Sequence, residues 1–335
     1  MNSLQRFACS LGFASSLMLG FAQSGYSQQY PQIDFSSRPS YLPNNVISLT
    51  FDDAPDWNNT ATVLDVLKEK GVKATFFING ENWSSLSADG PMQELVRRMV
   101  REGHELANHT SHHVHLGDLS PEQVRNEITS VENITSQIFG GNGPRLTLLR
   151  APFGEPFQFP TAAYETVAPI VAQHGVHVGW AVDSFDYNCP QGDAQCVYNG
   201  VVDKIRRPGQ GDYGIVLLHS VHSQTAMALP ALIDYIRDNG FQFWSVEQVV
   251  KARFGKTSDQ LVSGGNNGGG NNGGGNNGSG QNPDCGAPAW EQGHYYRVGE
   301  KVVYENQVFT AQNEDNPGYN PKISYWFWAA GPLCK

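Results

Sequence analysis

The chain has 335 residues, enough for one domain of about 200 to 250 residues and a small second module. Its formal net charge is −10, although only 16% of its residues are charged, and no cluster of Lys and Arg stands out. This balance argues against nucleic acid and anionic membranes as partners and favours a neutral polymer. We expect the protein to act as a monomer.

The N-terminal segment, residues 1–27, is typical of a cleaved secretory signal. Arg6 supplies a positive charge, the stretch from Phe7 to Phe21 is apolar, and small residues follow it. The apolar stretch is too short to span a membrane comfortably. We therefore leave this segment out of the fold and expect a secreted, extracellular protein.

Short apolar runs alternate with amphipathic segments between residues 46 and 254. The apolar runs predict strands at Val46–Phe51, Ala74–Ile78, Glu105–Ala107, Thr147–Leu149, His177–Ala181, Ile215–Leu218 and Gln242–Trp244. The amphipathic segments predict helices at Thr60–Lys70, Pro91–Glu102, Pro121–Phe139 behind an N-cap at Ser120, Ala162–His174, Val197–Arg206, Ala226–Asn239 and Val246–Phe254. This alternation implies a parallel sheet, either closed as a barrel or open and doubly wound.

The polar residues that follow the predicted strands favour the barrel. Each member of this set comes just after a different strand: Asp52 with Asp53, His109, Arg150, Asp183 and His219. Barrels of the βα type place their active sites at this end of the strands. We therefore predict an α/β fold, a distorted (β/α) barrel of about seven strands, with residues 28–262 as the catalytic domain.

The adjacent carboxylates Asp52 and Asp53, together with His109 and His113, predict a metal site beside a base. Residues four apart on a helix or helical turn share one face, so both imidazoles can reach one ion. Two His and one Asp leave coordination positions open, as in catalytic zinc sites. A metal lowers the pKa of bound water from about 15.7 to roughly 7, and the second carboxylate can take the proton. The alternative is that the Asp pair only caps a strand or forms a turn.

Residues 263–282 consist almost entirely of Gly and Asn and predict a flexible linker. Four cysteines remain outside the signal segment, an even number that suits an oxidising compartment. By proximity we pair Cys189 with Cys196 and Cys285 with Cys334, although four cysteines allow three connectivities. The second pair would bracket a C-terminal module, residues 283–335. A zinc site of four thiolates is the alternative, but the spacing does not support it.

The C-terminal module is rich in Trp, Tyr and Phe and is too small to bury all of these side chains. Flat aromatic rings stack on the apolar faces of sugars, so exposed rings here indicate polysaccharide binding. The alternative for any single ring is a place in a small core. We expect Trp290, Tyr319 and Trp328 to contribute to the binding face, and Trp326 to lie mostly in the core.

Five segments in order resemble the motifs of the polysaccharide deacetylases, the carbohydrate esterase family 4 enzymes with the NodB homology domain. The segments are Thr50–Asp53, His109–His113, Arg150–Gly154, Asp183–Tyr187 and Ile215–Ser220. The resemblance extends over about residues 44 to 255.

The resemblance implies that Asp53, His109 and His113 hold Zn²⁺, with another divalent transition metal left open. Asp52 would then be the general base that deprotonates the attacking water. Arg150 matches the arginine that holds this base, because a neighbouring cation keeps a carboxylate ionised and oriented.

The resemblance also assigns the groups around the substrate. The backbone N–H of Phe153 would stabilise the oxyanion. His219 would be the general acid that protonates the leaving amine, and Asp183 the carboxylate that tunes it. Leu217 and Tyr187 would line the pocket for the acetyl methyl group.

Three residues depart from the family pattern. Ala54 replaces the usual glycine, Tyr187 replaces the usual tryptophan, and Ser220 replaces the aspartate that is common at its position. These departures concern substrate preference and the methyl pocket more than the reaction. His112 is an alternative ligand to His113, and the motif favours His113.

The C-terminal module resembles the chitin-binding modules of carbohydrate-binding families 5 and 12. The resemblance rests on Ala289-Trp290, the segment from Tyr296 to Tyr304, Phe309-Thr310-Ala311 and Trp326. It implies a deacetylase of chitin or chitooligosaccharides that releases acetate. Acetyl xylan esterase and peptidoglycan deacetylase activities are alternatives, as are a catalytically silent binding protein and a glycosidase that uses Asp52.

Overall fold

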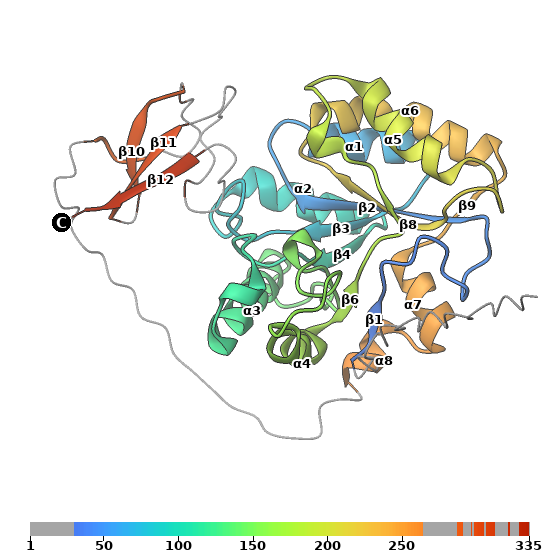
Figure 1. The fold of residues 1–335 in the computed structure, drawn as a ribbon, viewed down its shortest axis with the longest axis horizontal. Helices are drawn as coiled ribbons and strands as arrows, with labels where there is room; N and C mark the ends of the chain where they lie inside the picture. Colours follow the sequence, from blue (N-terminus) through green and yellow to red (C-terminus); the bar gives the residue numbers. More distant parts are fainter. Residues whose placement is uncertain are drawn as a thin grey trace, which may run out of the picture.

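The computed structural model describes residues 30–263 and, further on, residues 287–290, 296, 298–304, 306–311, 321 and 328–334. The expected signal segment and nearly all of the expected linker lie outside the described residues. The larger part is a curved parallel sheet with helices packed on it, and the C-terminal part contains a small separate sheet (Figure 1).

The large sheet has nine strands, and every pairing in it is parallel. They are β1 (Gln32–Ile33), β2 (Val46–Ala54), β3 (Thr75–Ile78), β4 (Glu105–Asn108), β5 (Leu148–Leu149), β6 (Val176–Val178), β7 (Val182–Asp183), β8 (Gly214–His219) and β9 (Gln242–Phe243). The strand order is β1-β6-β5-β4-β3-β2-β8-β7, and β9 also pairs with β2. The predicted barrel is confirmed in the form of a half-barrel. The strand order has two ends, β1 and β7, and these strands do not pair with each other.

The seven predicted helices are confirmed, and a short eighth follows them. They are α1 (Thr60–Lys70), α2 (Gly90–Arg101), α3 (Pro121–Ile138), α4 (Tyr164–His174), α5 (Ala194–Ile205), α6 (Ser223–Asp238), α7 (Val246–Phe254) and α8 (Ser258–Ser263). At the start of α3, Ser120 accepts a hydrogen bond from the Gln123 backbone N–H, and the Gln123 side chain accepts one from Ser120 N–H. This reciprocal cap explains why the predicted N-cap is correct.

Apolar and polar side chains alternate along β2, so one face of the strand packs into the core and the other leads to the candidate site. Ile47, Leu49 and Phe51 point into a large apolar cluster beneath α1, α5 and α6, which cover one side of the sheet (Figure 1). The intervening Ser48 and Thr50 are fully buried and polar. Side chains two apart in a strand share a face, so the face that carries Thr50 leads to Asp52 at the end of the strand.

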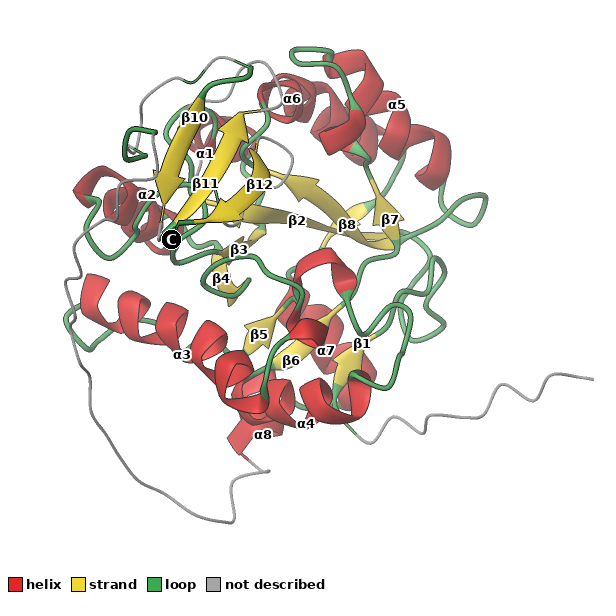
Figure 2. Ribbon diagram, turned by 60° about the vertical axis from the view of Figure 1, so that its left-hand side comes forward, coloured by secondary structure: helices red, strands yellow, loops and turns green. Residues whose placement is uncertain are grey.

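The C-terminal sheet is antiparallel and consists of β10 (Lys301–Tyr304), β11 (Gln307–Ala311) and β12 (Trp328–Leu333) (Figure 2). The prediction that Trp328 belongs to a binding face is wrong: it is 2% exposed and packs against Tyr296 with ring centroids 5.1 Å apart. Trp328 begins β12 opposite Ala311, where its ring fills the small core. Trp290 is half-buried against Tyr304. Tyr319 and Trp326 lie outside the described residues.

The predicted disulfide between Cys189 and Cys196 is present. Cys334 is also disulfide-bonded, and Cys285, its expected partner, lies outside the described residues. Within the part of the chain that the structure describes, no helix combines the length and apolar character that a bilayer crossing requires.

Candidate active site

The sequence-predicted polar residues gather at the carboxyl edge of the sheet. Asp52 and Asp53 lie near the end of β2, Asp183 ends β7 and His219 ends β8. His109 and Arg150 directly follow β4 and β5. Since all these strands run in parallel, their ends meet at one edge, as the sequence predicted.

Asp53, His109 and His113 form a group whose ligand atoms all lie within 4.8 Å of one another. Asp53 Oδ1 is 3.6 Å from His109 Nε2 and 3.4 Å from His113 Nε2. Asp52 Oδ2 is also only 3.5 Å from His109 Nε2, so both carboxylates face the same imidazole. Neighbouring residues of a regular strand point to opposite faces. Asp53 avoids this because its backbone is left-handed, with φ 65°, where the pairing with β3 shifts register.

The two candidate ligand histidines, His109 and His113, lie on a loop, and the expected helical turn is wrong. Thr110 and His113 both have a positive φ, which breaks any helix between His109 and His113. Asn79 fixes the loop by donating its Nδ2 to the carbonyls of His109 and Thr110. The alternative ligand His112 turns away, with its Nδ1 2.8 Å from Glu127 Oε1.

This donor set fits a divalent transition metal. His109 Nδ1 lies 2.8 Å from the Arg150 carbonyl, so Nδ1 carries the proton and the lone pair of Nε2 faces Asp53. Burial, with His113 adding to it, lowers the pKa of His109 to about 3, which keeps the imidazole neutral. Two imidazole nitrogens and a carboxylate are the ligand types of open zinc sites.

Asp52 is paired with Arg150, and both side chains are buried. Arg150 Nη1 donates to Asp52 Oδ1 at 2.6 Å and to Thr50 Oγ1 at 2.9 Å. Arg150 Nε donates to the Val178 carbonyl at 2.9 Å, and the guanidinium lies 4.1 Å from the Phe77 ring centroid. Burial raises the pKa of Asp52, and the Arg150 charge opposes this rise. The pairing leaves Asp52 Oδ2 directed at His109.

The carboxylate paired with His219 is Asp186, which corrects the assignment of Asp183 to this role. Asp186 Oδ1 lies 2.7 Å from His219 Nδ1, and Asp186 Oδ2 accepts hydrogen bonds from His219 N–H and from Thr225 Oγ1. Burial by itself would lower the pKa of His219, but Asp186 outweighs it and raises the value to about 10. His219 is therefore protonated at neutral pH. His222 lies within 4.8 Å of the same two groups.

Asp183 contacts the two aromatic residues that follow it. Its Oδ1 accepts the Phe185 backbone N–H at 2.8 Å, and its Oδ2 accepts the Tyr187 hydroxyl at 3.4 Å. Tyr187 is 45% exposed and meets the His219 ring edge to face, with centroids 5.5 Å apart. Tyr187 therefore lies beside His219.

Phe153 lies next to His113, and Leu217 lies on β8 two residues before His219. Phe153 has a left-handed backbone, its ring stacks on His115 with centroids 4.0 Å apart, and it makes a T-shaped contact with the His113 ring at 4.7 Å. Leu217 is buried in β8, where it pairs with Thr50 of β2 and Asp183 of β7.

Sequence reasoning missed two supporting asparagines, Asn79 and Asn82. Asn82 Nδ2 lies 3.4 Å from Asp53 Oδ1 and donates to Asn79 Oδ1. Both follow the predicted strand that ends at Ile78, and that position was the available signal. These amides orient Asp53 and the histidine loop.

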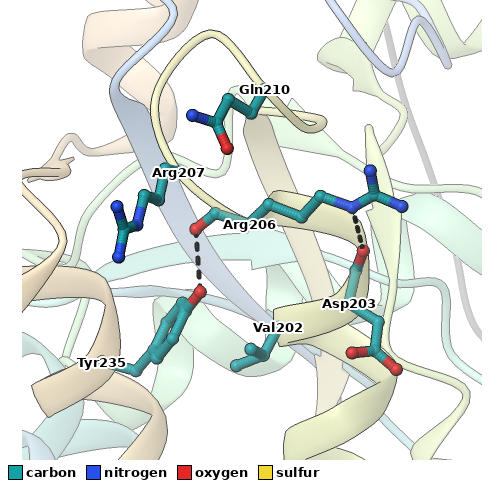
Figure 3. Close-up of a pocket in the computed structure, with 6 residues that line it drawn as sticks. All are labelled: Val202, Asp203, Arg206, Arg207, Gln210 and Tyr235. Carbon is teal, nitrogen blue, oxygen red and sulfur yellow. Dashed lines mark hydrogen bonds between the residues drawn. The ribbon is translucent and has the colours of Figure 1, made fainter.

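A separate pocket of about 470 Å³ contains none of the predicted site residues. It is lined by Val202, Asp203, Arg206, Arg207, Gln210 and Tyr235 (Figure 3). The Tyr235 hydroxyl donates to the Arg206 carbonyl, and Arg206 Nε donates to the Asp203 carbonyl. These hydrogen bonds lie at the C-terminal end of α5. No histidine lines the pocket, and no acid and base are paired there as they are at the candidate site.

The family model described as polysaccharide deacetylase matches residues 40–179. A chitooligosaccharide deacetylase from Rhizobium leguminosarum is 34% identical and matches 61% of this chain and 84% of its own length. A peptidoglycan-N-acetylglucosamine deacetylase from Listeria monocytogenes is 31% identical over 67% of this chain. The match spans 44% of the length of that Listeria protein.

The fold also matches solved structures. The chitin deacetylase of the fungal pathogen Colletotrichum lindemuthianum superimposes with a TM-score of 0.54 at 27% identity. The match covers 65% of this chain and 90% of that one.

Proposed function

This chain belongs to the polysaccharide deacetylase family, and we propose on that premise that it is a secreted, metal-dependent deacetylase of chitin or chitooligosaccharides. It would hydrolyse N-acetyl groups, release acetate and leave glucosamine units. One observation carries the proposal: a group of two histidines and a carboxylate that could hold a metal lies beside an arginine-held carboxylate, whose register partner on the next strand is a carboxylate-held histidine.

We infer that the ion held by Asp53, His109 and His113 is Zn²⁺. Two imidazoles and one carboxylate form a donor set that zinc accepts while keeping positions open. A bound ion would polarise the amide carbonyl and acidify a water molecule. The hydrogen bonds from Asn79 to the histidine loop support this arrangement.

Asp52 would take a proton from the attacking water. Its Oδ1 is held by Arg150, so Oδ2 is the oxygen that can accept it. The raised pKa of Asp52 suits this role, because burial makes the carboxylate a better proton acceptor. The backbone N–H of Phe153 would stabilise the negative charge that develops on the carbonyl oxygen.

His219 would give its proton to the leaving nitrogen as the carbon–nitrogen bond breaks. Asp186 holds Nδ1, so the proton on Nε2 is the one available. Water and the amide are thereby converted into acetate and a free amine. Tyr187 and Leu217 would border the acetyl methyl group.

The choice of chitin rests on the C-terminal module and on the relative from Rhizobium leguminosarum. Trp290 of the module is half-buried and would contribute to binding the polymer. Peptidoglycan is the second candidate substrate, because the relative from Listeria monocytogenes carries that name. Both polymers present N-acetyl groups to the same chemistry.

Acetate release tests the proposal. The purified full chain would be assayed in parallel on chitin oligomers, peptidoglycan fragments and acetylated xylan, before and after treatment with a strong chelator. We expect the highest activity on chitin oligomers, loss with the chelator and recovery with zinc. Activity confined to xylan, or unaffected by complete metal removal, would contradict the proposal.

A further inference from the structure

Phe185 is an exposed aromatic residue held in an unfavourable backbone conformation. Its side chain is 46% exposed, and its φ is 54°. Left-handed backbone is uncommon for a residue other than Gly, Asn or Asp. A conformation of this kind persists only where the surroundings fix it, and such positions cluster at functional sites.

Two neighbours fix Phe185. Asp183 Oδ1 accepts the Phe185 backbone N–H at 2.8 Å, and the Lys204 ammonium lies 4.2 Å from the centroid of the ring. Lys204 Nζ also donates to the backbone carbonyl of Asp183, so Asp183 and Lys204 contact each other as well as Phe185. The cation lies over the ring, and 46% of the side chain remains exposed.

The ring lies one aromatic residue away from the proposed acid. Phe185 and Tyr187 have ring centroids 5.9 Å apart, and Tyr187 meets His219 at 5.5 Å. Asp183 holds Tyr187 as well, through its hydroxyl. A long polymer whose acetamide lies at His219 can therefore reach Phe185.

We propose that Phe185 is a platform on which a sugar ring at least two units from the reacting sugar of the same polymer stacks, with Asp183 and Lys204 as positioning residues. The inference rests on the proposed deacetylase function and adds a specificity determinant to it. The apolar face of a pyranose matches a flat ring, and such stacking requires an exposed face whose direction is fixed. Only substrates long enough to reach Phe185 gain from the contact.

Steady-state kinetics on chitin oligomers from dimer to hexamer test the platform. In the full chain, Phe185→Gly removes the ring and accepts the left-handed backbone, so its Tm should not fall below that of the wild type. We expect KM for the pentamer and hexamer to rise about fivefold, with kcat nearly unchanged and the dimer unaffected. Phe185→Tyr is the matched control and should restore the KM for long oligomers.

Three other outcomes would contradict the platform or the proposed function. A folded Phe185→Gly variant with unchanged KM at every length would overturn the platform and leave the proposed deacetylation standing. An equal loss on dimer and hexamer through kcat would also overturn it. If the wild-type chain released no acetate from any oligomer, the proposed function itself would fall, and the platform with it.

Discussion

Asp52 on β2 and His219 on β8 are register partners on adjacent parallel strands. Neighbouring strands lie about 4.8 Å apart, so the proposed base and the proposed acid leave the sheet side by side. Each then turns to its own partner, Asp52 to Arg150 and His219 to Asp186. The spacing of the two groups is therefore set by backbone hydrogen bonds of the sheet.

The first prediction separates metal binding from proton transfer. We expect Asp52→Asn to keep the bound metal and to lower turnover by about 10² to 10³, because the amide cannot accept the proton. His113→Ala, by contrast, should lose the metal. Metal content after dialysis and acetate release measure the two effects. Substantial turnover in Asp52→Asn would move the base to another residue.

The second prediction concerns pH and compares Asp186→Asn with Asp183→Asn. His219 must be protonated to act as an acid, and Asp186 raises its pKa to about 10, so activity should persist below that pH and fall as pH rises through it. Without the Asp186 charge, the alkaline limb of kcat/KM should move down toward about 6.5, the ordinary histidine value, or lower.

Asp183→Asn is the matched control for this shift, because Asp183 makes no hydrogen bond to His219. We expect the alkaline limb to stay in place, whatever happens to KM for long oligomers. If the alkaline limb of the pH profile moved in Asp183→Asn and not in Asp186→Asn, Asp183 would again be assigned as the carboxylate that tunes His219.

The third prediction concerns stability. Arg150→Met should lower the free energy of unfolding by about 3 to 5 kcal/mol, because it leaves the Asp52 carboxylate buried without its partner. The double variant Asp52→Asn/Arg150→Met should be more stable than Arg150→Met alone. Urea unfolding of the four proteins in this cycle provides the measurement, and strictly additive changes would show that the pair is not coupled.

The fourth prediction concerns the C-terminal module. A chain ending after residue 263 should keep its kcat/KM on soluble chitin tetramer and lose adsorption to insoluble chitin. A pull-down with insoluble chitin, alongside acetate release, measures both properties. Undiminished adsorption of the shortened chain would assign polymer binding to the catalytic domain.

The sequence was sufficient for the elements with strong periodicity and clear ends. The limits of α1 are those predicted, because Val63, Leu64 and Leu67 form one apolar face and Gly71 ends the helix in a left-handed conformation. The two-residue strands β1 and β7 were not predicted as separate strands. β1 is defined by its pairing with β6, and β7 by its pairing with β8, and neither pairing is visible in the local sequence.

Site assignments failed where the answer depended on tertiary geometry. Asp183 and Asp186 are three residues apart, and only the fold shows which carboxylate reaches His219. The loop at His109 was read as helical because spacing does not report φ. Trp328 was expected on a surface because composition counts aromatic rings without saying which of them fill the core.

The left-handed Asp53 has a consequence for anyone who would transfer this chemistry to another protein. If the sequence Thr-Phe-Asp-Asp were grafted onto a regular strand, its two carboxylates would point to opposite faces of the sheet. A functional graft must therefore include the register shift beside β3, the Asn82 amide that contacts Asp53, and Asn79, which accepts a hydrogen bond from Asn82. The transferable unit is the irregularity in the strand together with its supports, and the motif alone is not enough.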